Sequence, residues 1–228
     1  MKIVIIAAMP RELAALSASW PTETIARNGR KFCVATTTEA IAVTAGMGPE
    51  NAARGLELAL ERTAISTVVS AGFAGALDPA LKVGDVLQAS TVIDAATGER
   101  FATAHGDGSS LVTISDVADA AEKLRLRETY FAHLADMEGA ALARVCVAHN
   151  LPFFAIKAIS DDAAFSLPVL NRFATAQGQF RTAAFALHVA LRPALWAKVR
   201  ELAKGASAAQ SGLARALRAF LSEHGHLS

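Results

Sequence analysis

Three acidic side chains stand next to apolar segments of the chain and are the first candidates for chemistry. Glu12 and Asp161 each follow an apolar run with the composition of a buried strand, and Glu138 lies within a largely apolar segment. Ligands of open α/β sheets bind beyond the carboxyl ends of the strands, which is where Glu12 and Asp161 would lie. Burial raises the pKa of a carboxyl group toward neutral pH, so carboxyl groups that converge in an apolar cleft suit general acid and base catalysis. Taken singly, each is better explained as a helix cap or as the partner of a lysine.

The segments that must position these residues alternate between strands and helices. We expect strands at residues 2–8, 31–37, 39–45, 66–70, 83–92 and 153–159. We expect helices at residues 12–19, 50–61, 118–129 and 137–150, followed by two long helices that finish the chain. Residues 71–76 are a run of small side chains that lets the backbone approach a ligand or a neighbouring strand, and residues 94–110 have the composition of a surface loop. The alternation predicts an α/β fold, a three-layer αβα sandwich around a central mixed, mostly parallel sheet.

Composition excludes several classes of protein. The 228 residues are 53% hydrophobic, which is too apolar for a disordered chain, and no apolar run approaches the roughly 18 residues that span a bilayer. The formal charge of +1 gives no overall field for nucleic acid or an anionic membrane, so we expect no nucleic-acid partner. The apolar run after Met1 is short and ends at Pro10, as in the first strand of a cytoplasmic protein rather than in a signal peptide. No linker or repeat is visible, so we expect a single domain over residues 1–228.

The common signatures of cofactor and metal sites are weak or missing. The glycine turn at residues 46–51 has Asn51 in place of the third glycine of a dinucleotide fingerprint, and no acidic residue ends the following strand. The histidines have no repeated short spacing, and Cys33 and Cys146 lie in apolar stretches without metal or redox spacing. No Gly-x-Ser-x-Gly elbow of a serine hydrolase is present. We expect no metal and no organic cofactor.

A set of motifs is more informative in combination. In order along the chain these are KIVIIAAMPRE at residues 2–12, AGMG at 45–48, AGFAGAL at 71–77 with VGDV at 83–86, DMEGAA at 136–141 and AISD at 158–161. Their order and spacing over residues 2 to 190 resemble the nucleoside phosphorylase superfamily, and within it the methylthioadenosine/S-adenosylhomocysteine nucleosidase branch. The Met-Glu and Ser-Asp motifs are the specific part of the resemblance.

The resemblance implies an N-glycosidase that releases adenine from a 5′-modified purine nucleoside by hydrolysis, through a ribose that becomes oxocarbenium-like. By position, Asp161 would protonate the purine at N7, Glu12 would orient or deprotonate the attacking water, and Glu138 would hold the ribose hydroxyls. Met137 would pack against the sugar. The family's further substrate-binding positions fall on Met9, Gly72, Phe73, Val117, Lys157 and Ser160. The resemblance also implies a homodimer.

Three departures from the family's pattern leave alternatives open. Ser70 and Phe73 stand where hexameric phosphorylases bind phosphate; phenylalanine cannot do so, which favours water over phosphate, although nucleosidases usually have serine at position 73. Lys157 replaces the usual arginine, keeping the charge but not the forked donor geometry. The loop before Val117 is shorter than its counterpart, and we place Val117 against the base. A phosphorylase with phosphate as the nucleophile and a non-catalytic nucleoside-binding module remain the alternatives.

The end of the chain, residues 192–228, is predicted to be a basic, amphipathic helical extension. Between residues 192 and 218 it holds six basic residues and one acidic residue, Glu201. Its apolar stripes favour packing on the core or on another subunit, and the alternative is weak contact with an anionic membrane surface. Together with residues 78–81 and 167–168, this extension also resembles the adenosylhopane nucleosidases of hopanoid synthesis.

Overall fold

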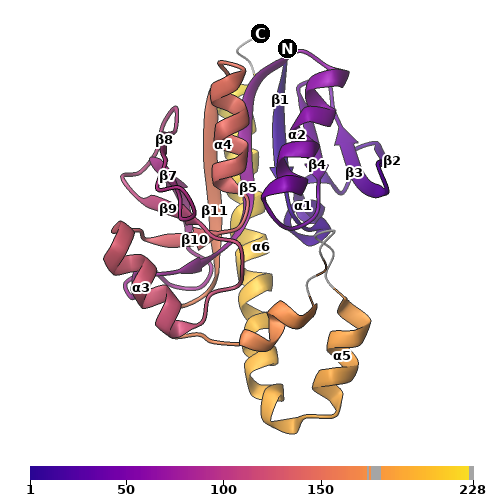
Figure 1. Ribbon diagram of the computed structural model, residues 1–228. Coiled ribbons are helices and arrows are strands. Elements are labelled where there is room, and N and C mark those ends of the chain that lie inside the picture. The colour runs from indigo at the N-terminus through magenta and orange to yellow at the C-terminus, as the bar shows by residue number, and fades with distance from the viewer. Residues whose placement is uncertain (174, 176–180, 226–228) are drawn as a thin grey trace.

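The first strand buries side chains on both of its faces, and this sets the layering of the molecule. In the computed structural model, which describes residues 1–173, 175 and 181–225, β1 (Lys2–Ala7) directs Ile3 and Ile5 to one apolar cluster and Val4 and Ile6 to another. Side chains of helices α1 (Pro10–Ser17) and α6 (Trp196–His224) complete the first cluster. Side chains of α2 (Pro49–Arg62) and α4 (Gly139–Ala148) complete the second. The sheet therefore lies between two helical layers, as Figure 1 shows.

The remaining elements complete the sheet and its edges. The other strands are β2 (Thr22–Arg27), β3 (Arg30–Thr36), β4 (Ala40–Thr44), β5 (Ile65–Ala76), β6 (Val86–Ala89), β7 (Thr91–Asp94), β8 (Arg100–Ala102), β9 (Ser110–Thr113), β10 (Leu134–Asp136) and β11 (Phe153–Asp161). The other helices are α3 (Ala120–Tyr130), α5 (Thr182–Ala190) and the short 3-10 helices η1 (Pro168–Phe173) and η2 (Pro193–Leu195).

Parallel pairing forms the centre of the sheet. The strand order is β2-β3-β4-β1-β5-β10-β9-β7-β8, and β11 pairs with β5 and with β6. Pairs β4–β1, β1–β5 and β5–β11 are parallel, as are β10–β9 and β9–β7. The pairs β2–β3, β3–β4 and β7–β8 toward the edges are antiparallel, and so are β5–β10 and β6–β11. The prediction of a three-layer α/β sandwich with a mixed sheet is confirmed. Strand β5 is central, since it contacts β1, β10 and β11.

Several element boundaries differ from those expected from the sequence. Strand β5 is a single strand of 12 residues that includes the small-residue run 71–76, because pairing with β11 continues through it. The strand expected at residues 83–92 is two strands, because β6 pairs with β11 and β7 pairs with β9. The expected loop at residues 94–110 contains β8. Strand β2 is mostly exposed and β10 has three residues, so neither carries a clear apolar signal.

The two helices that end the described chain differ in length from the prediction. Helix α5 has nine residues and α6 has 29, so only the second is long. Helix α6 packs against the sheet through Leu213, Leu217 and Phe220, while its first turns and α5 project beyond the sheet in Figure 1. Residues 226–228 of the expected extension lie outside the described residues. Among the described residues, no helix is long and apolar enough to cross a membrane.

Candidate active site

The turn between β1 and α1 places Glu12 in the interior. Helix α1 begins at Pro10, whose fixed φ suits the first helical position. One carboxylate oxygen of Glu12 accepts the backbone N–H of Met9 at 2.7 Å, and the other accepts that of Phe73 at 2.9 Å. Only 2% of Glu12 is exposed, and this burial raises the pKa of Glu12 above its ordinary value, against the two hydrogen bonds and the positive charge of Lys157. Glu12 is therefore a fixed carboxyl group that accepts a proton more readily than an exposed one does.

Strand β5 allows the Glu12 carboxyl group to lie close to its backbone. Gly72 has φ +149°, and a Cβ at this position would lie 3.0 Å from Glu12 Oε1. Phe73 contacts Glu12 through its backbone N–H, whereas its ring packs in the cluster with α1 and α6 and lies under the Arg11 guanidinium, 5.3 Å from the ring centroid. The small-residue run identified in the sequence therefore makes room for a catalytic candidate at Gly72.

Glu138 precedes α4 and faces the glycine turn that begins α2. Its Oε1 accepts the backbone N–H of Gly48 at 2.8 Å, and Gly48 has φ +94°, a conformation that favours glycine. Burial, followed by the negative charge of Asp136, raises the pKa of Glu138 to about 7. The charge of Lys157 and the Gly48 N–H oppose this rise, and the nearby charge of Glu12 adds to it. Glu138 thus changes charge near neutral pH.

A buried cation lies between these carboxyl groups. Lys157 is 1% exposed, and its Nζ lies 2.8 Å from Asp136 Oδ2 and 2.9 Å from Ser70 Oγ. Burial by itself would lower the pKa of Lys157, but the charges of Asp136 and Glu138, with a contribution from Glu12, raise the pKa above its ordinary value. The predicted substrate-binding lysine is therefore a buried ammonium that is already paired.

Asp136 was not predicted as a functional residue. Its side chain is buried and also accepts hydrogen bonds from the Thr113 hydroxyl at 2.7 Å and from the Gly139 N–H at 2.9 Å. It fixes both Lys157 and the start of α4. The only signal in the sequence was its place in the same Asp-Met-Glu motif as Glu138.

Asp161 lies at the end of β11, opposite Gly75 of β5. Its Oδ1 accepts the Ser160 hydroxyl at 2.7 Å, and its Oδ2 forms an ion pair with the Lys123 ammonium. Lys123 comes from α3 and was not singled out from the sequence. Its one signal was its position three residues before Leu126, which puts both side chains on the same inward face of the helix.

Strand β5 brings the predicted carboxyl groups together at one end of the sheet. Glu12 contacts it at Gly72 and Phe73, and Asp161 lies beside it at Gly75. Residues three apart on a strand are separated by about 10 Å. Glu138 joins them through its electrostatic interaction with Glu12. Two carboxyl groups beside nearby positions of one strand, with a third that interacts electrostatically with the first, can act as acid and base on a small ligand.

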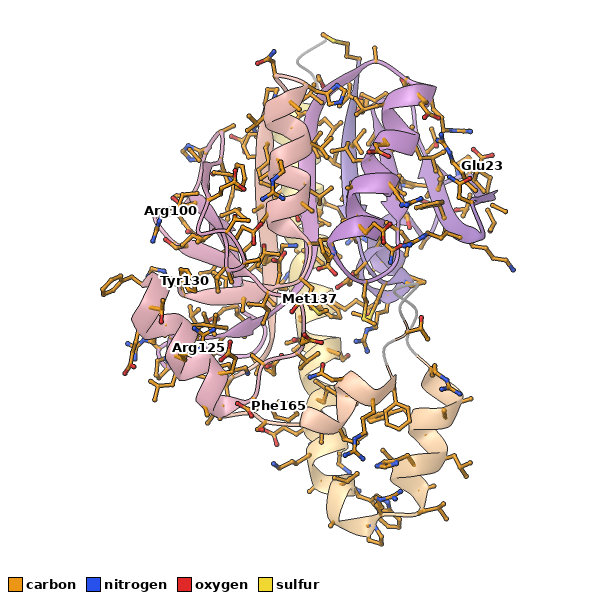
Figure 2. All side chains as sticks on the ribbon, in the orientation of Figure 1. Glu23, Arg100, Arg125, Tyr130, Met137 and Phe165 are labelled. Carbon is orange, nitrogen blue, oxygen red and sulfur yellow. The ribbon has the colours of Figure 1, made fainter. Side chains whose placement is uncertain are left out.

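The other predicted positions differ in how far they are exposed. Met9 and Met137 are half-buried, and Figure 2 shows Met137 beneath the lower end of α4. Val117 is 38% exposed in the loop before α3, and its backbone exchanges two hydrogen bonds with the Asn171 side chain. Among residues 1–173, 175 and 181–225, no group of three or more His, Cys, Asp or Glu side chains is placed to hold a metal ion.

Comparisons with known proteins relate this chain to a family. The family described as the phosphorylase superfamily matches residues 2–121 and 103–192. A 5′-methylthioadenosine/S-adenosylhomocysteine nucleosidase of Anoxybacillus flavithermus is 30% identical over 71% of this chain and 85% of its own. An aminodeoxyfutalosine nucleosidase of Campylobacter jejuni is 25% identical over 72% of this chain and 86% of its own.

A solved structure supports the fold over nearly the whole length. The 5′-methylthioadenosine/S-adenosylhomocysteine nucleosidase of Helicobacter pylori has a TM-score of 0.71 at 17% identity and covers 98% of both chains. The family match covers more than half of this chain, and the fold and the order of the motifs agree with it. The chain accordingly belongs to the phosphorylase superfamily.

Proposed function

We propose that this protein hydrolyses the N-glycosidic bond of a 5′-modified purine nucleoside, of the methylthioadenosine or S-adenosylhomocysteine type, and releases adenine. The observation that carries the proposal is the placement of two carboxyl groups along one strand, Glu12 at Gly72 and Asp161 at Gly75. The relative from A. flavithermus bears the name of this activity.

In the proposed reaction, the bond between ribose C1′ and purine N9 breaks and its electron pair goes to the base. Asp161 gives a proton to N7 of the departing purine, the oxygen of a water molecule bonds to C1′, and Glu12 takes a proton from that water. Glu138 accepts hydrogen bonds from the ribose hydroxyls. Solvent then returns a proton to Asp161 and removes one from Glu12, so each turnover leaves the protein unchanged.

The remaining predicted positions support these groups in the proposal. Met9 holds Glu12 in place, Gly72 leaves room for its carboxyl group, Ser160 orients Asp161, and Met137 packs against the sugar. Val117 lies against the base. Lys157 supplies positive charge beneath Glu12 and Glu138.

Water is the proposed nucleophile rather than phosphate. The side chain of Phe73 has no group that could bind an anion, its ring lies against Arg11, and its backbone N–H already donates to Glu12. The buried ammonium of Lys157 is paired with Asp136 and Ser70. Binding a phosphate here would therefore require breaking an ion pair, which is costly in the protein interior.

The test is a substrate panel with the product sugar identified. Purified protein is assayed for base release from methylthioadenosine, S-adenosylhomocysteine, aminodeoxyfutalosine, adenosylhopane and inosine, with and without phosphate. We expect adenine and a free sugar, at a rate that does not depend on phosphate. A sugar 1-phosphate product would show phosphorolysis, and a lack of release from every nucleoside would favour a binding protein.

The proposal extends to assembly and location. We propose a homodimer, as the family resemblance implies, and the large apolar side chains that are uncovered on one chain, such as Phe131, 80% exposed, and Val147, support it. We propose the cytoplasm as the location. Weak membrane-surface contact is proposed for the basic residues between positions 192 and 218 of the helical extension. Light scattering tests for the homodimer, and sedimentation with anionic vesicles tests for the membrane-surface contact.

A further inference from the structure

Lys123 is a buried lysine that the reaction described above does not use. It is 3% exposed in α3, and its ammonium pairs with Asp161 Oδ2 and donates to the backbone carbonyl of Asp162 at 2.6 Å. The Phe165 ring lies 6.0 Å from the same nitrogen. Lysine is rarely buried to this degree without a specific partner, because removing an ammonium from water is costly.

The backbone of β5 leaves room for this ion pair. A Cβ at Gly75 would lie 3.1 Å from Asp161 Oδ2 and 3.3 Å from Lys123 Cε. Contacts as short as these would require the two side chains to shift by a few tenths of an ångström. The strand therefore accommodates Lys123 and Asp161 together, just as Gly72 of the same strand accommodates Glu12.

Both oxygens of Asp161 accept hydrogen bonds in this arrangement. Ser160 donates to Oδ1 and Lys123 donates to Oδ2, which fits the carboxylate form. The carboxylate is the form that Asp161 has after it has given its proton to a leaving base. An adjacent ammonium in a buried site stabilises that form strongly, because charge-assisted hydrogen bonds gain strength away from water.

We propose that Lys123 is a positioning residue for the proton donor of this site. It fixes the Asp161 carboxyl group and stabilises the negative charge left there as the proton passes to the departing purine. The proposal rests on the proposed function and deepens it. The proton moves from Asp161 to the purine, while Lys123 keeps its own proton throughout, so the step balances without a further reactant.

The alternative is that Lys123 only anchors α3 and the segment after β11, through Asp162 and Phe165. A purely structural role predicts equal effects on every substrate. A role in leaving-group protonation predicts an effect only when the leaving group needs a proton. A substrate with a leaving group that departs as a stable anion separates the two.

The experiment compares methylthioadenosine with 4-nitrophenyl 5-methylthioriboside, whose 4-nitrophenolate departs without protonation. The variants are Lys123→Met, Lys123→Arg, and Arg127→Met as the matched control, since Arg127 is an exposed cation on the same helix. For Lys123→Met we expect kcat on methylthioadenosine to fall about 30-fold with KM changed less than about threefold. Its kcat on the nitrophenyl riboside should stay within about threefold of wild type. Lys123→Arg should recover most of the lost activity, and Arg127→Met should match wild type on both substrates.

Other outcomes would overturn the inference. Equal losses on both substrates in Lys123→Met, or no loss on either, would show that Lys123 is structural or dispensable. If Lys123→Met does not fold, the Lys123→Arg variant decides: a loss shared by both substrates counts against the proposal, and a loss confined to methylthioadenosine supports it. A wild-type protein that cleaves the nitrophenyl riboside but no purine nucleoside would instead refute the proposed function, and the inference with it.

Discussion

The surroundings of the carboxyl groups differ between the two ends of the candidate site. Glu12 is buried, Glu138 is half-buried, and both interact with Lys157, whose charge is already balanced by Asp136; the pKa values of both carboxyl groups are raised. Asp161 has an ammonium of its own in Lys123. The first environment makes carboxyl groups better proton acceptors, and the second stabilises a carboxylate that has lost its proton. This difference matches the roles proposed for the two groups, with Glu12 as the proton acceptor and Asp161 as the proton donor.

Removing the acceptor should have the largest effect. Glu12→Gln keeps an oxygen that can accept one backbone N–H but cannot take a proton from water, so we expect kcat to fall about 10³-fold. The loss should be equal on methylthioadenosine and on the nitrophenyl riboside, since both need the nucleophile. Steady-state kinetics on the two substrates measure it. Turnover within about tenfold of wild type would mean that another group serves as the base.

Removing the donor should have a smaller and selective effect. Asp161→Asn preserves shape but not the acidic proton, so we expect kcat on methylthioadenosine to fall at least about 10²-fold while nucleoside binding is retained. Turnover of the nitrophenyl riboside should change little. Comparing this variant with Glu12→Gln tests the two-ended arrangement directly. An equal loss on both substrates would place Asp161 outside leaving-group protonation.

The sequence pointed to the three carboxyl groups and to Lys157, but not to the cation that accompanies Asp161. Glu12 and Asp161 could be found because each follows an apolar run, and such runs mark strand ends, where ligands bind. The pair of Lys123 and Asp161 joins positions 38 residues apart, in a helix and a strand that only tertiary packing brings together. The pattern in one sequence does not contain that contact.

Tertiary contacts that a single sequence does not contain also explain why the end of strand β5 was predicted wrongly. Small residues have low strand propensity, so the sequence predicted the end of a strand at Ser70, yet pairing with β11 continues to Gly75. The layers of the fold were predictable, because β1 is apolar at every position after Lys2 and so must be covered on both faces. Contacts made by neighbouring strands override local propensity.

Glu138 should make ribose binding depend on pH. With a pKa of about 7, it is about one-tenth ionised at pH 6 and about nine-tenths ionised at pH 8. Since the ionised form is the better acceptor for the ribose hydroxyls, a ribose-containing inhibitor should bind up to about tenfold more tightly at pH 8 than at pH 6. Free adenine should lack this dependence, and Glu138→Gln should remove it. Calorimetric titrations at the two pH values provide the measurement, and equal pH dependence for adenine would exclude Glu138 from the sugar site.

Through the same carboxyl group, a rise in pH should lower the stability of the folded protein, although it strengthens ribose binding. The pKa of Glu138 is raised in the folded state, so the folded protein holds this proton more tightly than the unfolded chain does between about pH 4.5 and pH 7. The free energy of unfolding should therefore fall as the pH rises through this window. Glu138→Gln should be more stable than wild type by about 1–2 kcal/mol at pH 8 and show no such gain at pH 4.5. Urea unfolding at both pH values tests this, and a gain of the same size at pH 4.5 would point to a cause other than titration.

Replacing the ring of Phe73 should have the smallest effect on kcat, and replacing its neighbour Gly72 should have a larger one. Phe73 holds Glu12 through its backbone N–H, and that bond survives replacement of the ring. We expect Phe73→Ser to keep kcat within about threefold of wild type and to lose about 1–2 kcal/mol of stability, because the half-buried ring leaves its cluster with α1 and α6.

Gly72→Ala is the matched comparison. Its Cβ would meet Glu12 Oε1 at 3.0 Å in a strained conformation, so it should reduce kcat more than Phe73→Ser does. Kinetics and thermal unfolding of the two variants decide between backbone and side chain as the support for Glu12. A tenfold or larger change in kcat for Phe73→Ser would mean that the ring itself takes part in the site.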